Sequence, residues 1–125
     1  MRKAINLAVI ENKKILLVKK NETWILPGGK PDYPEESDED VLYREFGQEL
    51  PKTKIEILNY YKSFTGKTPH KGDELEAKVY FGRVYNLGKP SSEINDVKYM
   101  NNFNEYVLSD ITIKIVNSLK KDNYL

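Results

Sequence analysis

The chain contains no cysteine among its 125 residues, so disulfide bonds and thiolate metal sites are excluded. It also lacks any apolar run approaching the roughly 18 residues of a membrane span, and its amino terminus does not resemble a signal peptide. Basic and acidic side chains nearly balance, 20 against 19, which gives no indication of nonspecific nucleic-acid binding. We therefore expect a cytoplasmic protein without a membrane segment, and the length suits a single domain over residues 1–125.

The most informative segment runs from residue 24 to residue 52. It begins with the apolar run Trp24-Ile25-Leu26, which predicts a strand, and Pro27-Gly28-Gly29 follows directly. Glycine backbone can approach a ligand closely, and its carbonyl oxygens are suitable ligands for a hard metal ion. The pattern therefore predicts a strand that ends in a glycine loop beside a ligand.

A helix is predicted from about Ser37 to Leu50, because Ser37 can cap its start and three acids follow in the first turn. At about 100° per residue, one arc of this helix is apolar and comprises Leu42, Tyr43, Phe46 and Leu50. The neighbouring arc carries Arg44, Glu45, Gln48 and Glu49. Glu45 and Glu49 are four residues apart, so their carboxylates should repel each other unless a cation lies between them. The arc indicates either a divalent metal site or a solvated acidic surface.

These residues resemble the signature of the Nudix family, in which Gly, five residues, Glu and seven residues precede Arg-Glu, an apolar residue, any residue and Glu-Glu. Here Gly29 leads to Glu36 across six residues instead of five, and seven residues separate Glu36 from Arg44. The run from Arg44 to Glu49 then matches in step, except that Gln48 replaces the first of the two adjacent glutamates. Pro51-Lys52 also replaces the closing glycine and apolar residue of the signature.

The resemblance implies a role for each matching residue. Glu45 and Glu49 would be ligands of Mg²⁺ or Mn²⁺. Gly28 or Gly29 would be a backbone-carbonyl ligand of the metal, and both glycines would lie close to the substrate. Gln48 would contribute at most a neutral amide oxygen, which removes one negative charge from the metal site. The general base would be Glu45 or an acid outside the motif.

A second implied role is structural. Arg44 would pair with Glu36 and hold the preceding loop against the helix. The alternative interpretation of Arg44, an ordinary salt bridge, predicts the same pair. The outside acids considered are Glu74, Glu76 and Glu93, each of which is more typical of a solvated surface.

The rest of the chain predicts further strands and a closing helix. Residues 5–9 predict a strand with one buried face, and residues 15–18 a more fully buried one. Extended segments follow at residues 55–64, 79–85 and 97–100, with the second expected to be central. Ser109 can cap a helix that buries Ile111, Ile115, Val116 and Leu119. Together with the resemblance, this order predicts an α/β fold, the α/β/α sandwich of the Nudix family with a mixed β-sheet.

The resemblance implies a Mg²⁺-dependent hydrolase that cleaves a pyrophosphate bond in a nucleoside diphosphate linked to another moiety. In that reaction the metal activates water and a glutamate takes the proton. Gln48 leaves open an alternative, a catalytically weakened Nudix domain that binds a nucleotide as a regulatory module. A prenyl diphosphate isomerase would need a catalytic cysteine, which the chain lacks. If the motif were coincidental, an adaptor domain would remain.

Several residues bear on the substrate. The expected partner is a nucleotide or another diphosphate-containing small molecule. Its phosphates would need a few of the plentiful lysines, most of which should be solvated: Lys13, Lys14, Lys19, Lys20, Lys67 and Lys71. Tyr60, Tyr61 and Tyr80 could stack on a base, although aromatic residues in strands more often belong to the core. The remaining candidates lie in a polar loop over residues 65–73. There, Pro69 lies near a proline of the ADP-ribose subgroup, and His70 is more typical of a solvated side chain than of a base.

Overall fold

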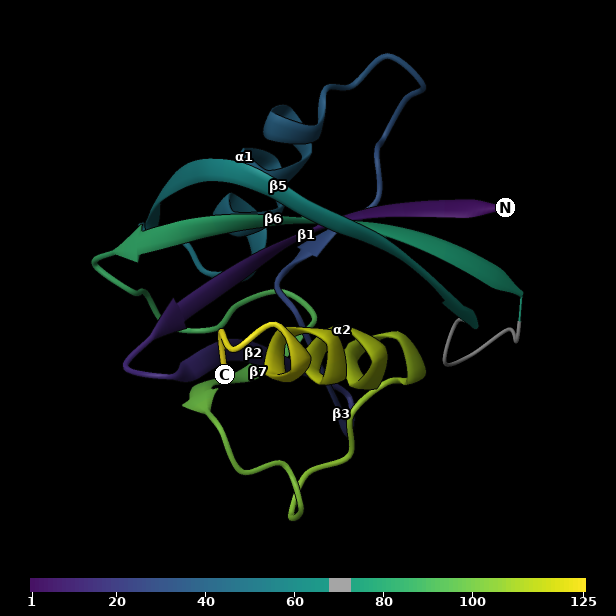
Figure 1. Cartoon of the computed structure of the whole chain (residues 1–125). Helices are drawn as coiled ribbons and strands as arrows, with labels where there is room; N and C mark the ends of the chain where they lie inside the picture. The colour runs from purple at the N-terminus through teal and green to yellow at the C-terminus, as the bar shows by residue number, and fades with distance from the viewer. Residues whose placement is uncertain (68–72) are drawn as a thin grey trace.

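The computed structural model describes residues 1–67 and 73–125, so the expectations for Pro69, His70 and Lys71 lie outside the described residues. A mixed sheet occupies the centre of the molecule, and a helix covers each of its faces (Figure 1). The elements are, in chain order, β1 (Arg2–Glu11), β2 (Lys14–Lys20), β3 (Thr23–Ile25), β4 (Gly28–Gly29), α1 (Asp38–Glu49), β5 (Lys54–Lys67), β6 (Glu74–Tyr85), β7 (Ile94–Met100) and α2 (Asp110–Lys121).

Strand β1 organises the sheet, whose order is β3-β2-β1-β6-β5. It pairs in parallel with β6, from Arg2 opposite Leu75 to Val9 opposite Gly82. The remaining ladders are antiparallel: β1 also pairs with β2 and β4, β2 pairs with β3 and β7, and β5 pairs with β6. The segment 79–85 therefore lies in a central strand, as predicted, because β6 runs between β1 and β5.

Two apolar cores lie on opposite faces of the sheet, and β1 contributes to both. Ile5, Leu7 and Val9 belong to the core beneath α1, whereas Ala4 and Ala8 belong to the core beneath α2. The prediction of one buried face for this strand was therefore wrong. Alanine is a weak strand signal, but its small side chain lets a helix pack close to the sheet. The two cores give the predicted α/β/α sandwich.

Helix α1 begins after Ser37, whose hydroxyl accepts the backbone N–H of Asp40 at 3.1 Å, as the sequence predicted. Its buried apolar residues are Val41, Leu42 and Phe46, with Leu50 at its end. Tyr43 is 53% exposed, so its assignment to the apolar arc was wrong. The buried arc is rotated towards Val41, and at about 100° per residue Glu45 and Glu49 fall between Val41 and Leu42 on the helix circumference. Both glutamates therefore face the protein.

The glycines after Leu26 form a short strand instead of a loop. Ile5 pairs with Gly29 and Asn6 with Gly28 in the β1–β4 ladder. Gly28 has a φ of 139°, and an added Cβ there would collide with the backbone of Ile5. The sequence signal for a close backbone approach was correct, but the close neighbour is β1.

Helix α2 begins after Ser109 and buries the four apolar residues that its sequence pattern predicted. Among the described residues, no helix is both long and apolar enough to cross a membrane.

Candidate active site

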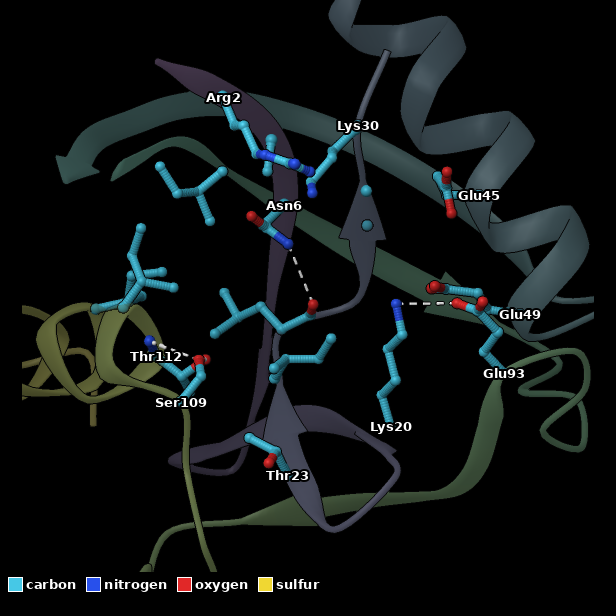
Figure 2. A pocket seen from close by; sticks show the side chains of 18 of the residues that line it. Arg2, Asn6, Lys20, Thr23, Lys30, Glu45, Glu49, Glu93, Ser109 and Thr112 are labelled. Atoms are coloured by element: carbon cyan, nitrogen blue, oxygen red, sulfur yellow. Dashed lines mark hydrogen bonds and ion pairs between the residues drawn. The ribbon is translucent and has the colours of Figure 1, made fainter. Parts of the chain in front are cut away.

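A cavity of about 410 Å³ lies where β1, β4 and the ends of both helices meet (Figure 2). One end is charged and includes Glu45, Glu49 and Glu93 together with Lys20 and Lys30. The other end is largely aliphatic, and its lining includes Ala4, Leu75, Ile111 and Ile115. Residues from the first strand, the glycine strand and both helices thus form one pocket with two chemically different ends.

Glu49 is the most perturbed acid in the pocket. Burial raises the pKa of its carboxyl to about 8, and the neighbouring charge of Glu45 adds to the increase. A backbone hydrogen bond from Gly28 and the charge of Lys20 act in the opposite direction. Among the described side chains, Oε1 of Glu49 is the one buried oxygen or nitrogen without a hydrogen-bond partner. Leaving a buried carboxylate oxygen unpaired reduces stability, so this atom calls for a functional explanation.

Glu45 lies directly against the glycine strand. A Cβ added at Gly29 would lie 2.6 Å from Oε1 of Glu45, so a larger residue here would displace the Glu45 carboxylate. The side chain of Glu45 is 15% exposed, and its Oε1 accepts a hydrogen bond from Nη1 of Arg44 at 2.8 Å. The absence of a side chain at Gly29 therefore lets a carboxylate reach the β4 backbone.

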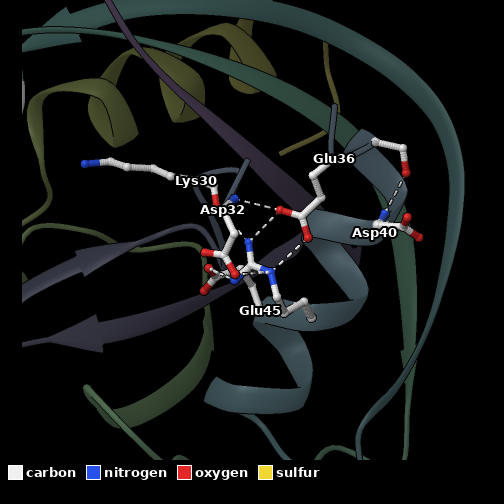
Figure 3. Close-up of polar contacts among 7 residues, drawn as sticks. Lys30, Asp32, Glu36, Asp40 and Glu45 are labelled. Carbon is white, nitrogen blue, oxygen red and sulfur yellow. Dashed lines mark hydrogen bonds and ion pairs between the residues drawn. The ribbon is translucent and has the colours of Figure 1, made fainter. Parts of the chain in front are cut away.

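Polar contacts connect α1 to the loop that precedes it, and Figure 3 shows Lys30, Asp32 and Glu36 of this loop close to Glu45 of the helix. Arg44 is the partner that these residues share. Its Nε and Nη2 donate to the two carboxylate oxygens of Glu36 at 2.9 and 3.0 Å, so the predicted pair is present. Nη2 also donates to the carbonyl of Lys30 at 2.8 Å, and Asp32 lies 3.2 Å from Nε. Hydrogen bonds from Arg44 and from the Asp32 backbone lower the pKa of Glu36. The same guanidinium thus fixes the loop and orients Glu45.

The side chain of Glu93 is 71% exposed, as expected for a surface acid, and it also lines the charged end of the pocket. Its Oε2 lies 2.9 Å from Nζ of Lys20, and that ion pair lowers the pKa of Glu93. The charge of Glu93 in turn raises the pKa of Glu49. Glu74 and Glu76, the other two acids considered, are not among the residues that line this pocket.

The structure does not bring every predicted residue into the pocket. Gln48 is exposed on α1 and does not line the cavity. The three tyrosines proposed for base stacking do not line it either. The rings of Tyr60 and Tyr80 contact each other edge to face, with their centroids 5.4 Å apart. Tyr61 packs against Phe81 and Tyr124.

Sequence reasoning missed several lining residues, namely Asn6, Thr23, Ser109 and Thr112, and it gave no role to Arg2 or Lys30. Asn6 had a signal, because it is the one polar residue in the apolar run from Ala4 to Ile10. The others are ordinary polar residues whose position depends on how α2 packs against β1.

The carboxylates fit a hard divalent cation. Across residues 1–67 and 73–125, no three His, Cys, Asp or Glu side chains are grouped so that they could hold a metal ion by themselves. Mg²⁺, however, is commonly bound by one or two carboxylates together with water and substrate phosphates. The unpaired Oε1 of Glu49, with Glu45 beside it against Gly29, provides such a partial site.

Comparison with protein families matches residues 1–108 to the NUDIX domain, and the chain belongs to this family. Solved structures give the same fold at low sequence identity. The MutT NUDIX hydrolase from Burkholderia pseudomallei is 20% identical with a TM-score of 0.76, over 93% of this chain and 95% of that one. An ADP-ribose pyrophosphatase from Streptococcus suis 89-1591 is 20% identical with a TM-score of 0.73, over 98% and 92%.

The solution structure of the E. coli ORF135 protein is similar as well, with 17% identity and a TM-score of 0.76 over 98% of this chain and 93% of that one. Comparison with curated protein sequences gives no match. The family and its hydrolase neighbours support a pyrophosphohydrolase, as the sequence predicted.

Proposed function

We propose that this chain, as a single Nudix domain, is a Mg²⁺- or Mn²⁺-dependent hydrolase that cleaves a pyrophosphate bond in a nucleoside diphosphate linked to another moiety. The observation that carries the proposal is the buried, unpartnered Oε1 of Glu49 beside the carboxylate of Glu45. Two adjacent carboxylates repel each other and lose hydration on burial, and a divalent cation relieves both costs. The cytoplasmic location expected from the sequence stays a prediction.

A bound cation would neutralise phosphate oxygens and make water a better nucleophile. In the proposal, Glu49 and Glu45 provide carboxylate oxygens for it, and Gly28 or Gly29 a carbonyl oxygen. Arg44 holds Glu45 in place while Glu36 and the Lys30 carbonyl hold Arg44. Gln48 is at most a peripheral neutral ligand, because its side chain is exposed.

The proton of the attacking water goes to a carboxylate of the charged end. Glu45 and Glu93 are the two candidates, since both line the cavity and neither is buried as deeply as Oε1 of Glu49. The substrate phosphates lie near Lys20 and Lys30, which line the same end. The nucleoside then occupies the aliphatic end between β1 and α2.

The names of two neighbours, a MutT NUDIX hydrolase and an ADP-ribose pyrophosphatase, support a nucleoside diphosphate as the substrate class. The second candidate is a weakened domain that binds a nucleotide without turning it over. It is favoured by Gln48, which replaces a family glutamate and lies outside the pocket.

A substrate panel tests the proposal. Nucleoside triphosphates, oxidised nucleotides, sugar nucleotides and dinucleoside polyphosphates are incubated with Mg²⁺, Mn²⁺ or a chelator, and products are separated by chromatography. We expect metal-dependent release of a nucleoside monophosphate from at least one class, and none from the Glu49→Gln variant. If the wild type is inert across the panel while a nucleotide still raises its melting temperature, the weakened binding domain replaces the enzyme.

A further inference from the structure

Asn6 is the polar residue in the wall between the two ends of the pocket. It lies on the α2-facing side of β1, in register between Ala4 and Ala8, which both pack in the core beneath α2. The side chain is partly buried and lines the cavity (Figure 2). Its backbone is fixed from both sides, because Asn6 pairs with Gly28 in β4 and with Val79 in β6.

The orientation of the Asn6 amide is determined by one hydrogen bond. Its Nδ2 donates to the carbonyl oxygen of Leu26 at 3.1 Å. A carbonyl can only accept, so the nitrogen must face Leu26 and the amide oxygen must face the other way. In Figure 2 this oxygen points from β1 towards the aliphatic side chains of the pocket. Within the described part of the chain, Oδ1 receives no hydrogen bond.

The surroundings of Oδ1 are mainly aliphatic, and Arg2, a charged residue of β1 that Figure 2 also labels, is engaged with Asp73 at 2.6 Å. Ala4, Leu75, Ile111 and Ile115 line this end of the cavity. The two hydroxyl groups at the start of α2 are bonded to each other, with Ser109 Oγ and Thr112 Oγ1 2.7 Å apart. A ligand that fills this end displaces water from the Asn6 oxygen. The ligand must then supply an N–H donor to Oδ1. Otherwise this oxygen would be buried without a hydrogen bond, which would weaken binding.

We propose that Asn6 is a specificity-determining residue that accepts a hydrogen bond from the exocyclic amino group of a nucleobase. The chain would thus select amino-bearing bases, of the cytosine or adenine kind, over their keto counterparts. This inference rests on the proposed function, which directs the phosphates to the glutamates and the base to the aliphatic end. A keto oxygen opposite Oδ1 would bring two acceptors together. Rotating the amide by half a turn would present Nδ2 to the keto oxygen, but it would place Oδ1 against the carbonyl oxygen of Leu26, which is also an acceptor.

Two pairs of nucleotides that exchange the amino group for a keto group test the inference: CTP with UTP, and ATP with ITP. We expect the wild-type kcat/KM to favour the amino member of at least one pair by about tenfold or more, as hydrogen-bonding sites do. In Asn6→Leu and Asn6→Ala, which remove the acceptor, the ratio falls to within about twofold.

The matched control is Asn95→Leu. Asn95 also donates its amide to a backbone carbonyl, that of Asn21 at 3.2 Å, but it does not line the cavity. This variant should keep the wild-type ratio. Thermal melting of each variant establishes that it is folded. Because both Asn6→Leu and Asn6→Ala remove the acceptor, the test can still be made if one of the two does not fold.

Binding of the products separates this inference from the proposed function. The affinities of CMP, UMP, AMP and IMP are measured by calorimetry for wild type and Asn6→Leu. Equal hydrolysis of both members in both wild-type pairs would overturn the inference and leave the hydrolase intact. If no triphosphate is hydrolysed, the rest of the substrate panel decides whether the hydrolase fails. The inference then stands only if wild type binds CMP over UMP, or AMP over IMP, with a preference that Asn6→Leu loses.

Discussion

The two helices begin in the same way and then differ. Each has 12 residues and follows a serine whose side chain accepts a backbone N–H from the first turn. Helix α2 ends with Lys120 and Lys121 at the negative end of its dipole, where positive charge is favourable. Helix α1 has no basic residue in its last turn and carries Glu49 there instead.

This difference indicates that the groups that reduce the stability of the fold lie in α1. The cap and the terminal lysines of α2 stabilise that helix, whereas α1 has an acid at its carboxyl end and an unpaired buried carboxylate oxygen. Departures of this kind are expected at functional sites and not in scaffold elements. The contrast between α1, which carries the proposed metal ligands, and α2, which provides apolar lining, can be tested by substitution.

The largest expected effect is on turnover. Glu49→Gln should lower kcat by at least about 100-fold at saturating Mg²⁺, because it removes a carboxylate from the proposed metal site while keeping the shape of the side chain. The matched control is Lys121→Gln in the last turn of α2, which is exposed and should keep the wild-type rate. A near-wild-type rate for Glu49→Gln would refute the metal assignment and the contrast between the helices.

The second effect is on both stability and activity. Arg44→Ala should lower the melting temperature by several degrees, because Glu36, Glu45 and the Lys30 carbonyl all lose a donor. It should also lower activity, since Glu45 is no longer held.

The control for Arg44 is Arg83→Ala, whose guanidinium lies 3.5 Å from Glu56 in an exposed pair. Exposed pairs contribute little, so its melting temperature should change by about a degree or less. Equal shifts for the two variants would remove the special role of Arg44.

The third effect is the pH dependence of the metal-free protein. The pKa of Glu49 is raised from 4.5 to about 8 in the folded state, so the folded protein holds a proton that the unfolded chain releases. Stability from this group is therefore present below about pH 4.5 and is lost as pH rises towards 8. One pKa unit corresponds to about 1.4 kcal/mol, so the loss amounts to a few kcal/mol at most.

Urea denaturation with a chelator at pH 5 and pH 8 measures this loss. Glu49→Gln cannot titrate, so its stability relative to wild type should increase between the two pH values. A constant difference between the proteins would mean that Glu49 ionises normally in the fold.

The smallest expected effect belongs to Gln48→Glu. Restoring the family charge should lower the Mg²⁺ concentration needed for half-maximal activity, because hard cations depend on ligand charge. The side chain is exposed and solvent screens its charge, so the change should be only a few-fold. A titration of initial rate against Mg²⁺ measures it, and an unchanged requirement would exclude Gln48 from the surroundings of the metal.

Local patterns were enough to predict much of the fold and part of the site. Both helix starts follow from a serine cap and a 3.6-residue apolar period, and the Arg44–Glu36 pair follows from spacing within one motif. The errors at Tyr43 and Ala8 arose because periodicity gives an arc but not which neighbour covers it.

The sequence by itself determined the helix caps, the acidic arc and the glycines that let a carboxylate approach the backbone, because each depends on residues close together in the chain. Only the tertiary structure decided that Glu93 joins Glu49, that Gln48 stays outside and that Asn6 turns its oxygen into an aliphatic pocket. These outcomes depend on contacts between segments far apart in the chain, which are set by how β1, β4 and α2 pack together. Local propensity carries no information about such contacts.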